Sequence, residues 1–294
     1  MHFLDSDDIL FPNAIEAALD FFEDTDVVKV HWPLINIDAS GTSTGKISPN
    51  LLLSEGNLLA ELVSSGPGGE GGFKHCPPTT GNLWSRKYLT KVFPIPELVY
   101  KTNADHYLLV LAAAFGELRK ISVPMALYRI HGSNITSKPI EEYSMLYFNY
   151  FEHSCEALSK VLSQKGIDVK QDHWPRDTWL HKIYYSIQEI TGFVANTRSF
   201  VLVDDNHLQT SEIIFGRKRI PFLEKFGRYW GQPLDDKSAI REIERQRLVG
   251  AQYIFFAWVS FWYLDYYQEM HTYLKSNYEC ILDNDRLLGF RLRK

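Results

Sequence analysis

The stretch MHFLDSDDILFPNAI, residues 1–15, decides how the fold is interpreted. Its mostly apolar start runs directly into Asp5, Asp7 and Asp8, the pattern of a strand whose carboxyl end delivers acidic side chains to a crevice. Pro12 then opens a helical pattern at a position where proline's missing N–H costs no hydrogen bond. A parallel strand normally has neighbours on both sides, and no preceding sequence could supply them. We therefore expect an N-terminal part of this domain to be missing.

The following sequence alternates strand and helix patterns. Strands are expected at Val27–Trp32, Leu34–Ile37 and Leu118–Val123, and a helix at Asn103–Phe115 that ends at a glycine. The Gly-rich segment Ser64–Gly72 is expected to be a mobile loop, because neither a strand before it nor a helix start after it is clear enough for a phosphate-binding turn.

The second half of the chain begins with helical spacing of its apolar residues and then changes to alternating strand and helix patterns. Helices are expected at Ile140–Gln164 and Trp179–Val194. After Asn196 the pattern becomes β-α-β-α-β, which predicts a small, largely parallel sheet covered by helices. The expected elements are strands at 199–203 and 253–258, helices at 237–249 and 261–275, and a strand or hairpin at 279–292. The chain is thus expected to be α/β, with one domain at 1–138, a helical connector at 139–196 and a small α/β domain at 197–294.

Composition excludes several classes of function. The 294 residues carry a formal net charge of -5 with 45% hydrophobic and 23% charged residues, which argues against nucleic acid as a partner. Three separated cysteines without CxxC spacing argue against a disulfide framework and fit a reducing compartment. The longest apolar stretch, Ala251–Leu264, is too short to span a bilayer, so no transmembrane segment is expected. The expected location is cytoplasmic, or peripheral at the inner face of the membrane.

Asp5, Asp7 and Asp8 bring three negative charges close together near the start of the chain. Three carboxylates at the end of a strand repel one another unless a cation lies among them, and Mg²⁺ or Mn²⁺ prefers such oxygen ligands. An acidic turn that caps the following helix would explain the same residues without a metal. The residues alone leave these two interpretations evenly balanced.

Four segments together resemble a known family. Residues 3–15 are similar to the DxD-containing strand–turn–helix of family-two glycosyltransferases. Residues 81–86, GNLWSR, resemble the segment that lines the donor-sugar and acceptor side in that family. Asp105 lies where such enzymes place the catalytic base, and residues 127–134, LYRIHGSN, resemble the YRxH element that closes the site. The four segments follow the family's order over about residues 1 to 137.

The resemblance implies a partial GT-A (Rossmann-like) domain and assigns roles to individual residues. Asp105 would be the catalytic base. Mn²⁺ or Mg²⁺ would be bound by Asp7 with the help of Asp5, Asp8 and His131. Donor or acceptor contacts would come from Asn82, Trp84, Arg86 and Arg129. One departure weakens the assignment of the base, because Ala104 stands where the family usually carries an acidic residue.

The implied reaction is transfer of a sugar from a nucleotide-diphosphate sugar to an acceptor hydroxyl, as in a hexosyltransferase. A single base and a stabilised leaving group fit direct displacement with inversion. The acceptor would be a glycan or a lipid-linked saccharide in surface polysaccharide or glycan synthesis. In the second half, residues 220–222 (IPF), 227–233 (GRYWGQP), 239–244 (AIREIE) and 261–264 (FWYL) resemble a domain attached to some bacterial sugar-transfer enzymes, which implies no activity of its own.

Structural explanations compete with these roles. Asp105 could serve only to stabilise a helix N-terminus, His131 could be a turn residue, and Trp84 could belong to the core. Tyr229 and Trp230 could form a carbohydrate platform or a packed aromatic loop.

Two other functions also compete for the whole chain. A truncated glycosyltransferase could bind a sugar or a partner protein without turnover. A haloacid-dehalogenase-like phosphohydrolase would use Asp5 as nucleophile and Asp7 as acid, but Asp8 and Ile9 do not match that family's pattern.

Overall fold

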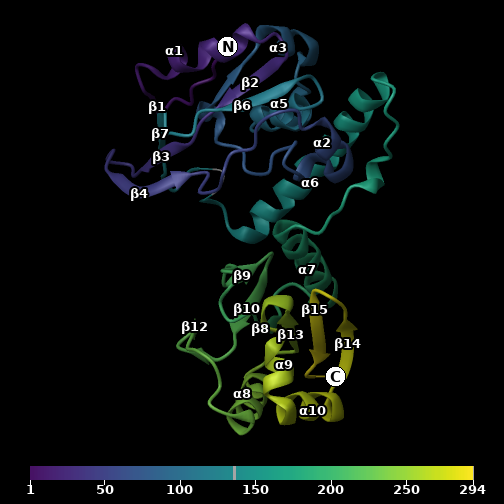
Figure 1. Ribbon diagram of the computed structural model, residues 1–294. Coiled ribbons are helices and arrows are strands. Elements are labelled where there is room, and N and C mark those ends of the chain that lie inside the picture. Colours follow the sequence, from purple (N-terminus) through teal and green to yellow (C-terminus); the bar gives the residue numbers. More distant parts are fainter. Residues whose placement is uncertain (135–136, 294) are drawn as a thin grey trace. The chain divides into compact units, whose positions relative to one another are not determined.

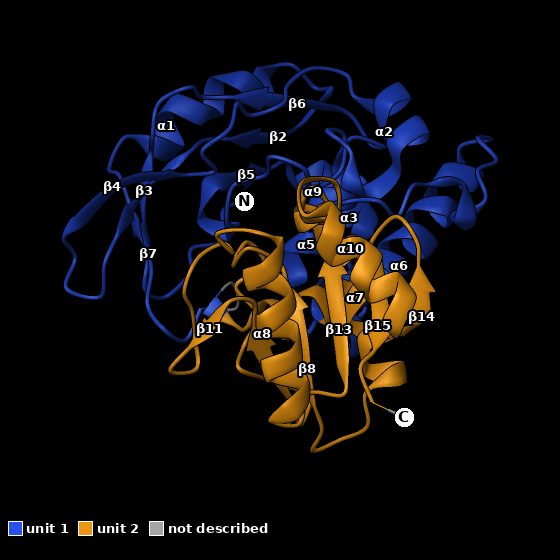
Figure 2. Cartoon of the chain, turned by 90° about the horizontal axis from the view of Figure 1, so that it is seen from below, with its two compact units in different colours: residues 1–137, 146–178 blue, residues 138–145, 179–294 orange. Residues whose placement is uncertain are grey.

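The computed structural model describes residues 1–134 and 137–293. The chain divides into two compact units, and each unit is built from two separate stretches. Unit 1 comprises residues 1–137 and 146–178, and unit 2 comprises residues 138–145 and 179–294. Figure 1 labels the helices and strands, and Figure 2 colours the two units.

Unit 1 contains two sheets. Strand order in one sheet is β5-β2-β6, with β2 parallel to β6, and in the other it is β1-β7-β3-β4, with β3 parallel to β7. The strands are β1 (Ile9–Leu10), β2 (Val27–His31), β3 (Leu34–Ile37), β4 (Ser43–Ser48), β5 (Asn82–Trp84), β6 (Glu117–Lys120) and β7 (Ala126–Arg129). The helices are α1 (Ala14–Leu19), α2 (Leu59–Ser65), α3 (Arg86–Val92), α4 (Glu97–Tyr100), α5 (Ala104–Ala112) and most of α6 (Ile140–Gln164).

The hydrophobic cluster of unit 1 that positions Asp105 lies where α3, α5 and α6 pack together. Tyr88 of α3, Leu108 and Leu111 of α5, and Phe151 and Leu158 of α6 are all buried in one cluster. The Tyr88 hydroxyl donates to the backbone oxygen of Leu108 at 2.6 Å, so this buried phenol keeps a hydrogen-bond partner. This packing fixes α5, which carries Asp105 in its first turn.

The prediction of a strand at the start of the chain is wrong. Residue His2 makes only an isolated antiparallel bridge to Leu83, and the flanking bonds join the Met1 nitrogen and oxygen to the Trp84 backbone. The partner strand β5 is only three residues long, so few residues at the start of the chain can pair with it. The short strand β1 instead follows the acidic turn and pairs with β7.

The Gly-rich segment is a packed turn rather than the expected mobile loop. Gly66 follows α2 and lies against Trp174, where an added Cβ would come within 2.2 Å of the indole ring. The carboxylate of Glu61 accepts the backbone N–H groups of Glu70 and Gly71 at 3.0 and 2.5 Å. A carboxylate from the preceding helix, outside the Gly-rich sequence, therefore orders the segment, which the glycine composition did not indicate.

Unit 2 contains a six-stranded sheet in the order β14-β15-β13-β8-β10-β9. Strand β8 is parallel to both β10 and β13. The strands are β8 (Ser199–Val203), β9 (Ile213–Ile214), β10 (Arg217–Pro221), β13 (Tyr253–Ala257), β14 (Glu279–Asp283) and β15 (Leu287–Arg291), with a separate hairpin of β11 (Glu224–Lys225) and β12 (Arg228–Tyr229). The helices are α7 (Trp179–Phe193), α8 (Asp236–Leu248), α9 (Trp262–Tyr266) and α10 (Gln268–Asn277).

Helices cover both faces of this sheet. Val201 and Val203 of β8 pack in one cluster with residues of α8, α9 and α10, while Phe200 and Leu202 pack in another with residues of α7. Figure 2 shows α8 and α10 lying over the strands on their shared face. The alternation along β8 is that of a strand buried on both sides.

The expected elements of unit 2 are largely confirmed, but the sheet is mixed rather than largely parallel. Strands β9 and β14 are antiparallel to their neighbours, and β15 is antiparallel to both of its own. The two-residue strands β9, β11 and β12 are too short to give a hydrophobic period, so the sequence did not indicate them.

The segment expected as a helical connector divides between the two units. Helix α6 begins in unit 2 and places most of its length in the core of unit 1. Helix α7 packs Ile183 and Ile187 in a cluster of unit 2. Within the described part of the chain, none of the helices has the length and apolar character needed to cross a bilayer.

Candidate functional site

The acidic turn Asp5–Asp8 lies between the first residues of the chain and β1. The Asp8 N–H donates to the Asp5 backbone oxygen at 3.2 Å, which closes the turn. The Asp8 side chain is only 8% exposed, and its Oδ1 accepts the N–H of Arg129 at 2.9 Å. Its other oxygen, Oδ2, is buried without a hydrogen-bond partner among the described residues. Such an unpaired buried oxygen is costly and requires an explanation.

A 3₁₀ turn at Thr79–Gly81 connects the acidic turn with Asp105. The Thr80 hydroxyl accepts the Asp5 N–H at 3.2 Å, and the Thr79 hydroxyl donates to Asp105 Oδ2 at 2.8 Å. The Asn82 amide donates to the backbone oxygen of Pro78 at 2.9 Å and so braces the turn. Asn82 is fully buried in β5, so its hydrogen bond to the turn is shielded from water.

The electrostatics of Asp105 follow from its position. Burial raises the pKa of Asp105, and the hydrogen bond from Thr79 partly offsets this effect. Burial also raises the pKa of Asp5, and the nearby charges of Asp8 and Asp105 raise it further. The carboxylates of the acidic turn and of α5, a hundred residues apart in sequence, thus share one region in which negative charge is poorly solvated.

Arg129 and His131 hold the acidic turn from the other side. The Arg129 Nε donates to the Asp7 backbone oxygen at 2.9 Å, and its Nη1 donates to the backbone oxygen of Asp38 at 3.1 Å. The His131 Nδ1 accepts the N–H of Ser133 at 3.1 Å. The proton of the neutral ring therefore sits on Nε2, which donates to Asp7 Oδ2 at 2.9 Å. In this arrangement Arg129 fixes the backbone at Asp7, and His131 orients its carboxylate.

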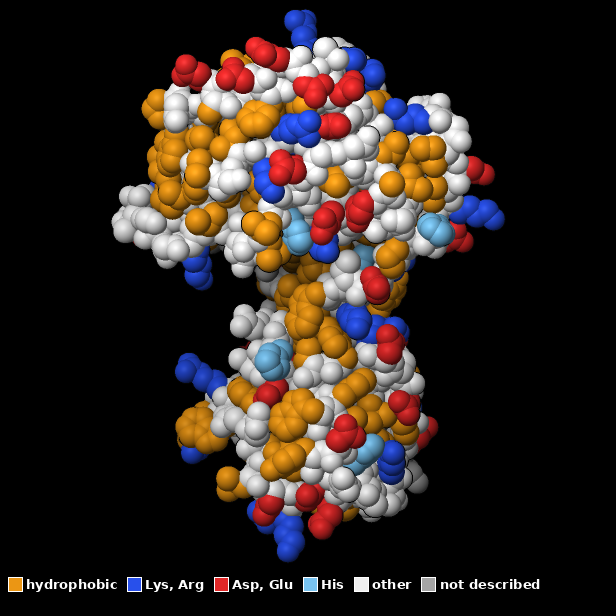
Figure 3. All heavy atoms as spheres, viewed as in Figure 1, with side chains coloured by type: hydrophobic (Ala, Val, Ile, Leu, Met, Phe, Trp, Pro, Cys, Tyr) orange, Lys and Arg blue, Asp and Glu red, His pale blue; other side chains and the backbone are white. Residues whose placement is uncertain are grey.

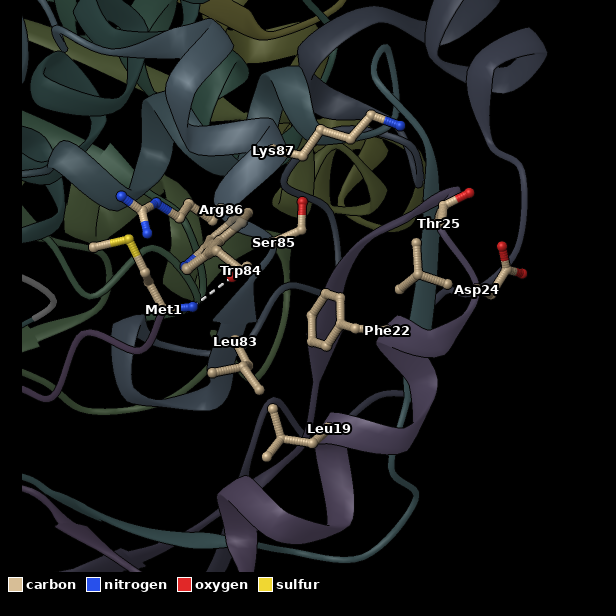
Figure 4. Close-up of a pocket in the computed structure, with 11 residues that line it drawn as sticks. Met1, Leu19, Phe22, Asp24, Thr25, Leu83, Trp84, Ser85, Arg86 and Lys87 are labelled. Atoms are coloured by element: carbon tan, nitrogen blue, oxygen red, sulfur yellow. Dashed lines mark hydrogen bonds between the residues drawn. The ribbon is translucent and has the colours of Figure 1, made fainter.

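Trp84 and Arg86 line a separate pocket of about 370 Å³ at the start of the chain (Figure 4). Leu19 and Phe22 lie on one side of this pocket, with Arg86 nearer the other. Trp84 is 1% exposed and stacks on Tyr88 at 5.7 Å between ring centroids, so most of it belongs to the core. Arg86 is exposed at the rim of the pocket.

The acidic residues do not form a complete metal cage. Within residues 1–134 and 137–293, no three His, Cys, Asp or Glu side chains are arranged to hold a metal ion by themselves. Mg²⁺ and Mn²⁺ in nucleotide sites commonly take one or two carboxylates and complete their shell with substrate phosphates. The unpaired Asp8 Oδ2 and the mutually repelling carboxylates fit a cation held in that way.

Several residues of the site escaped the sequence interpretation. Thr79 and Thr80 were missed, because a pair of threonines after two prolines carries no specific signal. Lys29 was also missed, although a lysine within the apolar run of β2 is unusual. It is fully buried, and its Nζ lies 3.7 Å from the Cys76 Sγ. Burial lowers the pKa of Lys29 and raises that of the Cys76 thiol.

Comparison with known proteins gives one informative match. The chain is 32% identical over 132 residues to an uncharacterized glycosyltransferase of Nostoc sp. (strain PCC 7120 / SAG 25.82 / UTEX 2576). The matched part is 45% of this chain and 39% of that protein, so the chain spans well under half of its relative's length. No protein-family model matches the chain. Nearly half of the chain is therefore related to part of a glycosyltransferase.

Proposed function

We propose that the chain is a metal-dependent glycosyltransferase that inverts the configuration of the transferred sugar. The donor would be a nucleotide-diphosphate sugar, and the acceptor a hydroxyl of a glycan or of a lipid-linked saccharide, in surface polysaccharide or glycan synthesis. The observation that carries the proposal is the connection of the acidic turn to Asp105 through the hydroxyls of Thr79 and Thr80. The similarity to a glycosyltransferase of Nostoc supports the same class of reaction.

Asp105 is suited to the role of general base. Burial raises the pKa of its carboxyl, which makes the ionised form a stronger proton acceptor. In the proposed step, Asp105 takes the proton of the acceptor hydroxyl while the hydroxyl oxygen bonds to the anomeric carbon. The bond from that carbon to the diphosphate oxygen breaks on the opposite face, and the electron pair leaves with the nucleoside diphosphate. No covalent enzyme intermediate forms, so the configuration inverts.

The acidic turn is suited to hold the cation of such a reaction. Asp7 would bind Mn²⁺ or Mg²⁺, with Asp8 or Asp5 assisting, and His131 would keep the Asp7 carboxylate in place through its Nε2. The bound cation would neutralise the charge that develops on the departing diphosphate. Arg129 ties the turn to β7 and to the turn after β3, so the carboxylates keep their positions when substrate binds.

The first test measures ligand binding and turnover together. Purified protein is mixed with Mn²⁺ and a panel of nucleotide sugars, and thermal stability and released nucleoside diphosphate are recorded. We expect metal-dependent stabilisation by one donor, since a ligand that binds only the folded state raises the melting temperature. Diphosphate release should accompany it, and Asp7→Asn should lose both. Asp20→Asn, the same change at an exposed position after α1, should retain both.

The outcomes separate the competing functions. Stabilisation without diphosphate release would identify a binding protein that does not turn over. Release of inorganic phosphate from simple phosphate esters, lost in Asp5→Asn, would favour a phosphohydrolase. Absence of both stabilisation and release with every donor would contradict the proposal for this chain.

A further inference from the structure

Lys29 is a lysine in the interior of unit 1. It stands in the middle of β2 with none of its surface exposed. The lysine and arginine side chains visible in Figure 3 project from the surface, where water solvates their charge. A buried ammonium group is costly unless a carboxylate pairs with it, and among the described residues no carboxylate pairs with Lys29. An apolar side chain would avoid this cost, so the lysine at this position requires a chemical explanation.

The thiol of Cys76 is the hydrogen-bond partner of this amine. The Lys29 Nζ donates to the Cys76 Sγ at 3.7 Å, and the thiol donates in turn to the Gly72 backbone oxygen at 3.3 Å. The Trp84 indole also faces the amine, with 5.6 Å between Nζ and the ring centre. Cys76 is half-buried, whereas Lys29 is fully buried. Two nucleophilic groups are thus held together below the surface of unit 1.

Oxidation of the sulfur would allow these two groups to bond. A cysteine sulfenic acid condenses with a nitrogen atom to a sulfenamide, in which sulfur and nitrogen are joined directly. The nitrogen must belong to a neutral amine, because an ammonium group has no free electron pair. Burial lowers the pKa of Lys29 and so favours the neutral amine. Burial raises the pKa of the Cys76 thiol, and the neighbouring Lys29 acts against this increase, so oxidation of the sulfur would be the slower step.

We propose that Cys76 and Lys29 form an oxidative cross-linking site, at which hydrogen peroxide causes the Sγ and Nζ atoms to join through a sulfenamide bond. Peroxide first transfers one oxygen atom to the thiol, which gives the sulfenic acid and water. The Lys29 Nζ then bonds to Sγ, the S–O bond breaks, and the oxygen leaves as water with a proton from the amine. The sulfur loses the electron pair that the peroxide gains, so the reaction needs no further oxidant.

The cross-link would connect two parts of unit 1 that are far apart in the sequence. Lys29 belongs to β2, and Cys76 lies between the Gly-rich segment and the 3₁₀ turn at Thr79–Gly81. The bond would therefore tie this turn to the central strand of the sheet β5-β2-β6. Neither atom takes part in the proposed sugar transfer, so the cross-link forms whether or not the chain catalyses that reaction.

Peptide mass spectrometry of the full chain tests this site. The folded protein is treated with hydrogen peroxide, the peroxide is removed with catalase, free thiols are blocked in denaturant, and the chain is digested without reductant. We expect a species that joins the peptides of Lys29 and Cys76 and is lighter than their sum by two hydrogen atoms. A thiol reductant should cleave the bond and return both peptides. Protein that is oxidised in denaturant should lack this species, because only the fold brings the two atoms together.

Substitutions assign the bond to these two side chains. Cys76→Ser and Lys29→Met should each abolish the cross-link, and methionine is a side chain of similar length that suits a buried position. In Lys29→Met the sulfur should instead be oxidised further, to the sulfinic acid. Two matched controls should keep the cross-link. Cys280→Ser removes an exposed thiol, and Lys91→Met removes an exposed amine of α3.

Three results would overturn the inference. A sulfinic acid at Cys76 of the unchanged protein, without the cross-link, would show that Lys29 does not capture the oxidised sulfur. A Cys76 that stays a free thiol at peroxide concentrations that oxidise Cys280 would show that the oxidant does not reach it. A cross-link retained in Lys29→Met would assign the nitrogen to another residue. The first two results come from the unchanged protein, so the test holds even if Lys29→Met fails to fold.

Discussion

At the scale of a single residue, the hydroxyl of Thr79 affects the pKa of Asp105. It donates to Asp105 Oδ2 at 2.8 Å, and this bond lowers a pKa that burial has raised. The threonine therefore positions the proposed base and holds it in the form that accepts a proton.

Replacing this hydroxyl should shift the pH dependence of the reaction. In Thr79→Val the ionised form of Asp105 loses a donor, so the pKa of Asp105 rises further. The acidic limb of the kcat/KM profile should therefore move to higher pH. Thr79→Ser, which keeps the hydroxyl, should restore it. An acidic limb that stays in place in Thr79→Val would show that Thr79 has only a structural role.

His106, beside Asp105, makes unit 1 sensitive to acid. It is buried against Phe73, with ring centroids 4.5 Å apart, and burial lowers its pKa from 6.5 to about 4. Between these values the unfolded chain binds a proton that the folded chain does not. The folded state is therefore most stable, as far as His106 is concerned, above about pH 6.5. As the pH falls below this value the free energy of unfolding decreases, by about 3 kcal/mol near pH 4.

Denaturant unfolding of unit 1 between pH 7 and pH 4 measures this loss. His106→Phe, which keeps an aromatic ring, should flatten the dependence, though His31 will leave part of it because burial also lowers the pKa of His31. His153→Phe, at a more exposed position on α6, should leave it unchanged. An equal slope in His106→Phe and the unchanged protein would show that His106 does not carry the effect.

At the scale of elements, the long helices and buried strands could be predicted, because their period repeats often enough to be recognised. Helices α6 and α7 and strands β2, β3, β8 and β13 lie where the sequence indicates. The structure at the start of the chain and the strands of two residues could not be predicted, because their pairing depends on the length of a distant partner strand. The Gly-rich segment was misjudged for a related reason, since Glu61 and Trp174 order it from outside its own sequence.

The residues of the candidate site could be predicted only where they form a pattern that is uncommon in sequences. Acidic residues after an apolar run, and an aspartate at a helix start, stand out. Asn82 and Trp84 stand in a motif that resembles donor-side residues, yet one braces a turn and the other lies largely in the core. The hydroxyls that connect the acidic turn to Asp105 could not be predicted, because Ser and Thr are common in turns and their partners are set by the tertiary fold.

At the scale of the whole molecule, α6 belongs to both units. Its first residues pack in unit 2, where Ile140 joins a hydrophobic cluster and the Glu141 carboxylate accepts the Ser211 N–H at 3.4 Å. Its later residues, including Leu158, lie in the core of unit 1. Two substitutions in one helix should therefore weaken different units.

Native-state hydrogen exchange distinguishes the two effects. Ile140→Ala should lower amide protection in β8 and β10, by about 2 kcal/mol, and leave β2 and β6 unchanged. Leu158→Ala, at a fully buried position, should do the reverse, by about 3 kcal/mol. Loss of protection in both units from either substitution would mean that they unfold as one cooperative body.

The division of α6 also limits how the gene could be rearranged. A recombination event that moved codons 179–294 to another gene would transfer the sheet of unit 2 without Ile140 and Glu141. The protein encoded by the remaining gene would keep the first turn of α6 but lose the unit 2 residues that pack against it. A break before codon 138 would move the whole of unit 2, but with it residues 146–178 that belong to the core of unit 1. No single crossover point yields two intact products, so the two halves are expected to be inherited together.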